Sequence, residues 1–213
     1  MRIAVFGAAG NVGSRVVAEA WARGHEVTAV VRGHRNLSGL PADVDVRTGD
    51  ARDPDDVAAA TVGQDLVITA TRPAPGREAE LPEATWALLA GIGKTGVRVL
   101  AVGGAGSLTV PGTGGRTVAG MPDFPADWAP IAAACAEQLD VYRAAPAEID
   151  WAYLSPAAIL EPGERTGVYR LGGDTLLVDA DGNSSISTED LAVALLDEAE
   201  RPRHHRTRFT VGY

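Results

Sequence analysis

The sequence predicts an α/β fold in which helices cover both faces of a doubly wound parallel sheet, and three observations predict it. A glycine-rich turn, Gly7–Gly13, joins an apolar strand to a helical pattern. A second strand follows that helix and ends at Arg32, and strands and helices then alternate as far as Val102. Strict alternation is typical of parallel sheets, because each crossover helix lets the next strand run in the same direction.

The first βαβ unit consists of the apolar strand Ile3–Phe6, the glycine-rich turn and a helix from Asn11 to Ala22. Gly7 permits the tight strand-to-helix turn, Gly10 leaves the backbone open to a phosphate, and Gly13 lets the helix pack close to the sheet. The helix then presents free N–H groups and the positive end of its dipole. We therefore expect a dinucleotide with its pyrophosphate at this turn, and the alternative is merely a tight turn.

The end of the second strand indicates which dinucleotide is bound. Proteins specific for NAD place an Asp or Glu there, which binds the ribose 2′-hydroxyl. This chain has Arg32 at that point, and Arg35 follows in the same loop. Because a guanidinium suits a 2′-phosphate that a carboxylate would repel, the sequence favours NADP over NAD. The alternative is that both arginines are ordinary solvated loop charges.

The remaining elements are predicted from apolar runs and helix-end signals. Gly24 ends the first helix, Asp53 and Pro54 open the second, and Ser187 or Thr188 caps the last. The predicted strands are Val44–Arg47, Asp65–Ala70, Val97–Val102, Asp150–Leu154 and Thr207–Val211. The predicted helices run from Asp53 through Ala60, Pro82 to Lys94, Trp128 to Arg143 and Leu191 to Ala199.

We expect one domain, consisting of a cofactor-binding core (residues 1–158) and a small C-terminal substrate lobe (residues 159–213). A Gly- and Pro-rich segment at about 107–127 follows a strand that ends at the cofactor edge, so it is a candidate substrate lid. Phe124 and Trp128 could stack on a planar substrate ring. The alternative for both aromatics is ordinary packing.

Composition excludes several classes of protein. A formal charge of −9 argues against a nucleic-acid surface, which needs clustered Lys and Arg. Cys135 is the single cysteine, so no intrachain disulfide forms, and no histidines have metal-ligand spacing. The N-terminus lacks the apolar run of a signal peptide, and no stretch is apolar enough for a membrane helix. We therefore expect a cytoplasmic protein without a metal or a membrane partner.

Several segments together resemble a known family. The glycines of the first turn have the form G-x-x-G-x-x-G, and Gly103-Gly104-Ala105-Gly106-Ser107-Leu108, Tyr153-Leu154-Ser155-Pro156-Ala157 and the segments 161–167 and 187–192 add to the likeness. The chain resembles the atypical short-chain dehydrogenase/reductase group that contains NmrA-like proteins, biliverdin reductase B-type flavin reductases and bacterial NADH-flavin reductase-like proteins. The likeness covers nearly the whole chain and implies a Rossmann-like fold with an NAD(P) cofactor.

The resemblance also implies roles for individual residues. Ser107 holds the position of the family's active-site serine, where its hydroxyl could orient a substrate, and the alternative is a loop serine that caps backbone groups. Asp50 matches an Asp that accepts a hydrogen bond from the adenine amino group, and the alternative is a turn-forming Asp. The expected cofactor-binding residues are Gly7, Ala8, Gly10, Asn11, Val12, Gly13, Arg32, Arg35, Asp50, Ala51, Ala70, Thr71, Arg72, Gly103, Gly104, Ser155, Pro156 and Ala157.

A pair of residues used by typical short-chain dehydrogenases is missing from this chain. Those enzymes use Tyr-x-x-x-Lys, in which the lysine lowers the pKa of the tyrosine proton donor. Lys94 is the single lysine and precedes the fifth strand, and Tyr142, Tyr153 and Tyr169 have no lysine at the required spacing. Reduction of a ketone needs such a donor, whereas a flavin or quinone ring can take its proton from water.

The sequence therefore favours an NADPH-dependent oxidoreductase that passes hydride to a flavin- or quinone-like planar acceptor. The competing function is a non-catalytic sensor of NADP(H), as in NmrA-like proteins. A third candidate, a nucleotide-sugar epimerase or dehydratase, is weakened by the missing tyrosine–lysine pair. The sequence leaves open whether the protein is a monomer or a homodimer.

Overall fold

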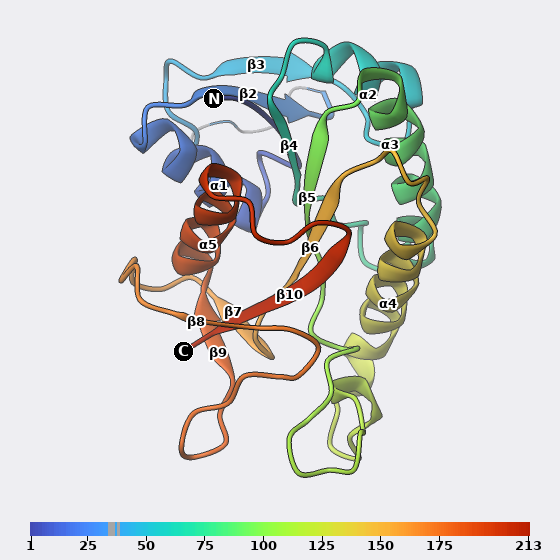
Figure 1. Cartoon of the computed structure of the whole chain (residues 1–213), viewed down its shortest axis with the longest axis vertical. Coiled ribbons are helices and arrows are strands. Elements are labelled where there is room, and N and C mark those ends of the chain that lie inside the picture. Colours follow the sequence, from blue (N-terminus) through green and yellow to red (C-terminus); the bar gives the residue numbers. More distant parts are fainter. Residues whose placement is uncertain (34–36, 38) are drawn as a thin grey trace.

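The computed structural model describes residues 1–33, 37 and 39–213, and an eight-stranded sheet forms its centre (Figure 1). The strand order is β3-β2-β1-β4-β5-β6-β10-β8, and β8 is antiparallel to β10 while the other neighbours are parallel. These strands are β1 (Arg2–Phe6), β2 (Glu26–Val31), β3 (Asp45–Thr48), β4 (Leu66–Thr69), β5 (Arg98–Val102), β6 (Trp151–Ser155), β8 (Arg170–Gly172) and β10 (Thr207–Gly212).

Helices cover both faces of the sheet, as the doubly wound prediction requires (Figure 1). The helices are α1 (Asn11–Ala22), α2 (Pro54–Thr61), α3 (Leu81–Thr95), α4 (Ala129–Arg143) and α5 (Thr188–Glu200). Within β1, Ile3 and Val5 pack in the core under α1 and α5, while Ala4 and Phe6 pack under the other three helices. Because β1 is buried on both faces, its sequence is a continuous apolar run rather than an alternating one.

Helix ends follow the signals in the sequence. Gly24 follows α1 with φ +79°, a conformation that favours glycine. Asp53 accepts hydrogen bonds from the backbone N–H groups of Asp55 and Asp56. Of the two predicted caps of the last helix, Ser187 and Thr188, the structure has Ser187 at the N-cap of α5. Its Oγ accepts a hydrogen bond from the Asp190 N–H at 2.9 Å. The predicted bounds of α1 are confirmed, and the predicted ends of the central strands lie within one residue of those observed.

The C-terminal segment 159–213 is divided between the central sheet and a smaller structure. Its strand β10 lies between β6 and β8, and its helix α5 packs on α1. The side chains of Phe209 and Val211 on β10 are buried in the main core, which explains why this strand joins the sheet. Two further strands, β7 (Ile159–Glu161) and β9 (Ser185–Ser187), form a separate two-stranded sheet.

The chain order creates a crevice between β1 and β4. From β1 the chain winds outward to β2 and β3, and it then returns to the other side of β1 and winds through β4, β5 and β6. Open α/β sheets bind ligands at such a switch point, outside the carboxyl ends of the strands. The glycine-rich turn after β1 and the segment after β4 therefore border the expected binding crevice.

Candidate active site

The turn between β1 and α1 is shaped to admit a phosphate. Gly7 has φ +79°, and a Cβ built on it would lie 2.5 Å from the Ala70 carbonyl oxygen. A Cβ on Gly13 would lie 2.1 Å from the Gly7 oxygen, so the helix packs too closely for any side chain there. Gly10 is the N-cap, and α1 has neither a capping side chain nor an acid in its first turn. This helix end fits a pyrophosphate, whose oxygens would satisfy N–H groups that α1 leaves without a side-chain cap.

Two cavities at this crevice form one groove. One half, of about 320 Å³, lies over the glycine turn and the ends of β2 and β3, and we name it the nucleotide half after the ligand that the sequence predicts there. The other half, of about 740 Å³, lies between the segments after β4, β5 and β6, helix α4 and the predicted lid, and we name it the acceptor half after the acceptor that the sequence predicts. The residues that line both halves are Val12, Ala70, Thr71, Arg72, Leu81 and Leu160.

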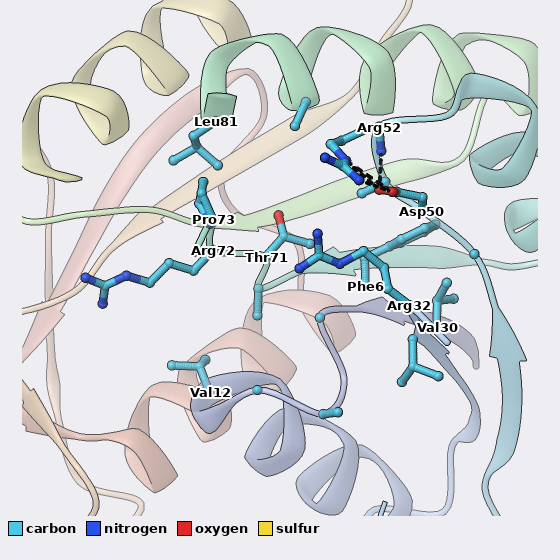
Figure 2. Close-up of a pocket in the computed structure, with 18 of the residues that line it drawn as sticks. Phe6, Val12, Val30, Arg32, Asp50, Arg52, Thr71, Arg72, Pro73 and Leu81 are labelled. Atoms are coloured by element: carbon cyan, nitrogen blue, oxygen red, sulfur yellow. Dashed lines mark hydrogen bonds and ion pairs between the residues drawn. The ribbon is translucent and has the colours of Figure 1, made fainter. Parts of the chain in front are cut away.

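Two charged residues pair in the nucleotide half, and Arg32 lines the same half (Figure 2). Arg52 donates to both carboxylate oxygens of Asp50, with Nε at 3.1 Å from Oδ1 and Nη2 at 2.6 Å from Oδ2. These bonds lower the pKa of Asp50, and the nearby charge of Arg32 lowers it further. Asp50 and Arg32 both line the nucleotide half, whereas Arg35 lies outside the described residues. The sequence analysis does not include Arg52 among the site residues. Its position two residues after Asp50 in the same loop could have indicated that its side chain pairs with Asp50.

The acceptor half is mostly apolar. The predicted substrate residues Phe124 and Trp128 both line it. Helix α4 supplies much of its inner wall, through Ile131, Ala132, Cys135 and Gln138, none of which the sequence reasoning selected. Within the described lining, the titratable side chains are Arg72, Asp123 and Cys135. Burial raises the pKa of the Cys135 thiol to about 11, so this thiol is neutral near pH 7.

The glycine run after β5 lies flat against α4 and β6. A Cβ on Gly103 would lie 2.0 Å from the Tyr153 ring, and one on Gly106 would lie 2.8 Å from the Ala132 Cβ. The Tyr153 hydroxyl lies 2.9 Å from the Cys135 carbonyl oxygen and 3.1 Å from Gln138 Oε1. Burial raises the pKa of Tyr153 well above its usual value. This tyrosine supports the cavity wall and does not face the cavity as a proton donor.

Ser107 is not brought to the cavity wall. Its Oγ accepts a hydrogen bond at 2.8 Å from Nη1 of Arg208, a largely buried guanidinium that also donates to Asp174 from Nε at 2.7 Å. The Thr109 backbone N–H donates to the Asp174 carbonyl oxygen at 2.9 Å. Ser107 thus contributes to the base of the lid, which is tied to the segment that follows β8.

The other predicted residues divide into those that line the groove and those that lie behind it. Ala8, Gly13 and Ser155 are buried behind the groove and do not line it, and the Ser155 hydroxyl has no hydrogen-bond partner among the described residues. The predicted residues that line the groove are Gly7, Gly10, Asn11, Val12, Arg32, Asp50, Ala51, Ala70, Thr71, Arg72, Gly103, Gly104, Phe124, Trp128, Pro156 and Ala157.

Other chemistries find no support in the part of the chain that the structure describes. Lys94 lies at the end of α3 and pairs with Asp55 at 2.6 Å, away from the groove. No group of three or more His, Cys, Asp or Glu side chains in the described ranges is arranged to hold a metal ion. No helix among the described residues has the length and apolar character needed to cross a membrane.

Comparison with known proteins relates the whole chain to one family. A family model for NAD(P)H-binding proteins matches residues 7–202. The protein YwnB of Bacillus subtilis is 38% identical over 99% of this chain and 98% of its own. Among solved structures, a "putative epimerase" from Bacteroides thetaiotaomicron is 41% identical with TM-score 0.89, covering 100% and 96% of the two chains. A "putative NADH-flavin reductase" from Streptococcus pneumoniae is 34% identical with TM-score 0.88, covering 100% and 99%.

Proposed function

The chain belongs to the NAD(P)H-binding family, and from that premise we propose that it is an oxidoreductase that uses NADPH to reduce a flavin- or quinone-like acceptor. The single observation that carries this proposal is the two-part groove. One half borders an uncapped helix N-terminus, and the other is a large apolar cavity. Because the two halves share wall residues, ligands in both would approach each other beside Val12 and Thr71.

The nucleotide half has groups suited to NADPH. The backbone at Gly10 and the first turn of α1 would hold the pyrophosphate, since the N–H groups there have no capping side chain. Arg32 stands where an NAD-specific protein has its carboxylate, so it would bind the 2′-phosphate. Asp50 would remain an acceptor for the adenine amino group while it holds Arg52. These features support a preference for NADPH over NADH.

The acceptor half is suited to a planar ring. When bound, NADPH supplies a hydride, and the reduced acceptor takes its accompanying proton from water. Phe124 and Trp128 would orient the ring, and the lid segment around Phe124 would limit the entry of water. The described lining has no tyrosine, lysine or histidine to protonate a substrate oxygen. This absence favours an acceptor that needs no such donor.

The test is an anaerobic assay of NADPH oxidation with FMN, riboflavin and menadione as acceptors. We expect turnover by the wild-type protein and its loss in the double variant Phe124→Ala/Trp128→Ala, with NADPH affinity retained. Retained affinity separates damage to the acceptor half from damage to the fold. Tight NADPH binding without turnover on any planar acceptor would overturn the enzymatic proposal.

NADPH binding without turnover would support the competing function, a non-catalytic NADP(H) sensor. A sensor needs no proton donor, so the lack of one in the described lining is compatible with this function. An epimerase function would fit the name of the Bacteroides relative. Epimerases and dehydratases of this fold family need an acid–base group beside the substrate. Among the described wall residues Asp123 lies exposed on the lid and the Cys135 thiol is neutral near pH 7, so neither favours that chemistry.

A further inference from the structure

The described lining of the acceptor half contains one positive charge in a mostly apolar setting. Arg72 follows β4 and lines both halves of the groove. Figure 2 shows its side chain extending away from Arg32, Asp50 and Arg52, past Val12. The charge of Arg72 also acts on the Cys135 thiol, where it opposes the rise in pKa caused by burial. The guanidinium therefore reaches toward the inner wall of the acceptor half.

Arg72 differs in its partners from two other arginines near the groove, Arg52 and Arg208. Arg52 is bound to Asp50, and Arg208 is bound to Asp174. Among the described residues Arg72 makes no ion pair and no hydrogen bond within the protein. Asp123, the single acid in the described lining of the acceptor half, is exposed on the lid and does not pair with it. With respect to the described residues, all five guanidinium N–H donors of Arg72 are thus available to a ligand.

A ligand that fills the acceptor half would remove water from Arg72. Loss of that hydration is unfavourable unless the ligand supplies an acceptor of opposite charge. The cofactor's pyrophosphate already has the N–H groups of α1, and its 2′-phosphate has Arg32, which follows β2. The anion that Arg72 can bind is therefore best sought on the second substrate.

We propose that Arg72, which the sequence analysis expects among the cofactor-binding residues, is instead the specificity residue for an anionic group on the acceptor, so that the substrate is a planar ring carrying a phosphate or carboxylate. This inference rests on the proposed function, because it assigns the substrate class of the same groove. FMN and riboflavin are suitable probes, since they share one ring system and differ in a phosphate. A charge-assisted bidentate contact predicts that FMN binds about ten- to a hundredfold more tightly than riboflavin.

The test is calorimetric titration of FMN and of riboflavin into the NADP⁺-loaded protein, which requires no turnover. We expect Arg72→Gln to remove the preference for FMN while riboflavin binding and NADPH binding stay within about threefold of wild type. Arg72→Lys should keep part of the preference, because it retains the charge without the planar fork. The matched control is Arg143→Gln, which removes the same charge from the far end of α4, outside the groove.

Three results would overturn the inference. Equal affinity for FMN and riboflavin in the wild-type protein is one, and an unchanged preference in Arg72→Gln is another. A loss of NADPH affinity in Arg72→Gln with the FMN preference intact would instead make Arg72 a cofactor residue. If FMN is preferred through Arg72 but NADPH is never oxidised, the inference stands and the proposed oxidoreductase function fails.

Discussion

The two halves of the groove are assembled in different ways. The nucleotide half is built mainly from the first part of the chain, where backbone geometry at Gly7–Gly13 and short loops after β2 and β3 place its groups. The acceptor half draws on the ends of β4, β5 and β6, the lid, α4 and Leu176. Its shape therefore depends on packing between distant segments. A site that depends on local backbone geometry can be predicted from the sequence, whereas a site that depends on tertiary packing is much harder to predict.

The largest effect should come from filling the phosphate cradle with a side chain. Gly10 has φ −81° and ψ 172°, which valine adopts readily, and a Cβ there would meet only the Gly7 oxygen at 3.1 Å. We expect Gly10→Val to weaken NADPH binding by about a hundredfold or more, since two charge-assisted hydrogen bonds are worth at least ~3 kcal/mol.

Thermal unfolding checks that this variant keeps the fold, and its midpoint should stay within about 4 °C of wild type. Gly173→Val is the matched control, because Gly173 lies outside the groove with open space around its Cβ position. NADPH affinity equal in wild type and Gly10→Val would mean that the pyrophosphate does not bind at this turn.

The next largest effect concerns the choice of nucleotide. We expect Arg32→Asp to weaken NADPH binding by about ten- to a hundredfold and to leave NADH binding unchanged or stronger, because a carboxylate repels the 2′-phosphate and accepts from a 2′-hydroxyl. Calorimetry with both nucleotides measures the change in preference. Arg47→Asp, which alters an exposed arginine of β3 outside the groove, should leave it unchanged. A variant that still prefers NADPH as strongly as wild type would remove Arg32 from the cofactor site.

A smaller effect is expected in the acceptor half. Phe124→Ala should raise the KM for the acceptor by about tenfold and leave NADPH affinity unchanged, because a lost aromatic contact costs about 1–1.5 kcal/mol. Trp86→Ala is the control, since Trp86 is an exposed aromatic on α3 outside both halves. If Phe124→Ala weakens NADPH binding and leaves the acceptor KM unchanged, the division of the groove into two halves is wrong.

The smallest effect should come from Ser107. Its hydroxyl binds Arg208 and does not reach the cavity, and Arg208 keeps Asp174 when that hydroxyl is removed. We therefore expect Ser107→Ala to lower kcat/KM by no more than about threefold, the equivalent of a weak hydrogen bond. Steady-state kinetics with NADPH and FMN checks this. A loss above about a hundredfold would restore the direct catalytic role that the family resemblance implies for Ser107.

The sequence predictions are confirmed where a feature depends on local chain geometry, and they miss features that depend on tertiary packing. The parallel strands of the central sheet, the α1 bounds and the Asp53 cap could be predicted because each depends on residues close together in the chain. The partner of Ser107 could not, since Arg208 lies in β10 and its contact depends on how that strand joins the sheet. For the same reason the sequence does not predict that α4 forms a cavity wall. Its alanines predict only that the segment is helical. The packing of Gly104 and Gly106 against α4 is a tertiary contact that only the structure reveals.

The most direct test of a groove that joins NADPH to a planar acceptor is a single-turnover experiment. NADPH-loaded protein is mixed anaerobically with FMN, and the loss of NADPH absorbance is followed. We expect oxidation to be faster than with free NADPH and FMN, and this acceleration to disappear in Gly10→Val. Protein-bound NADPH that is oxidised no faster than free NADPH, by FMN and by menadione alike, would contradict the proposed reaction.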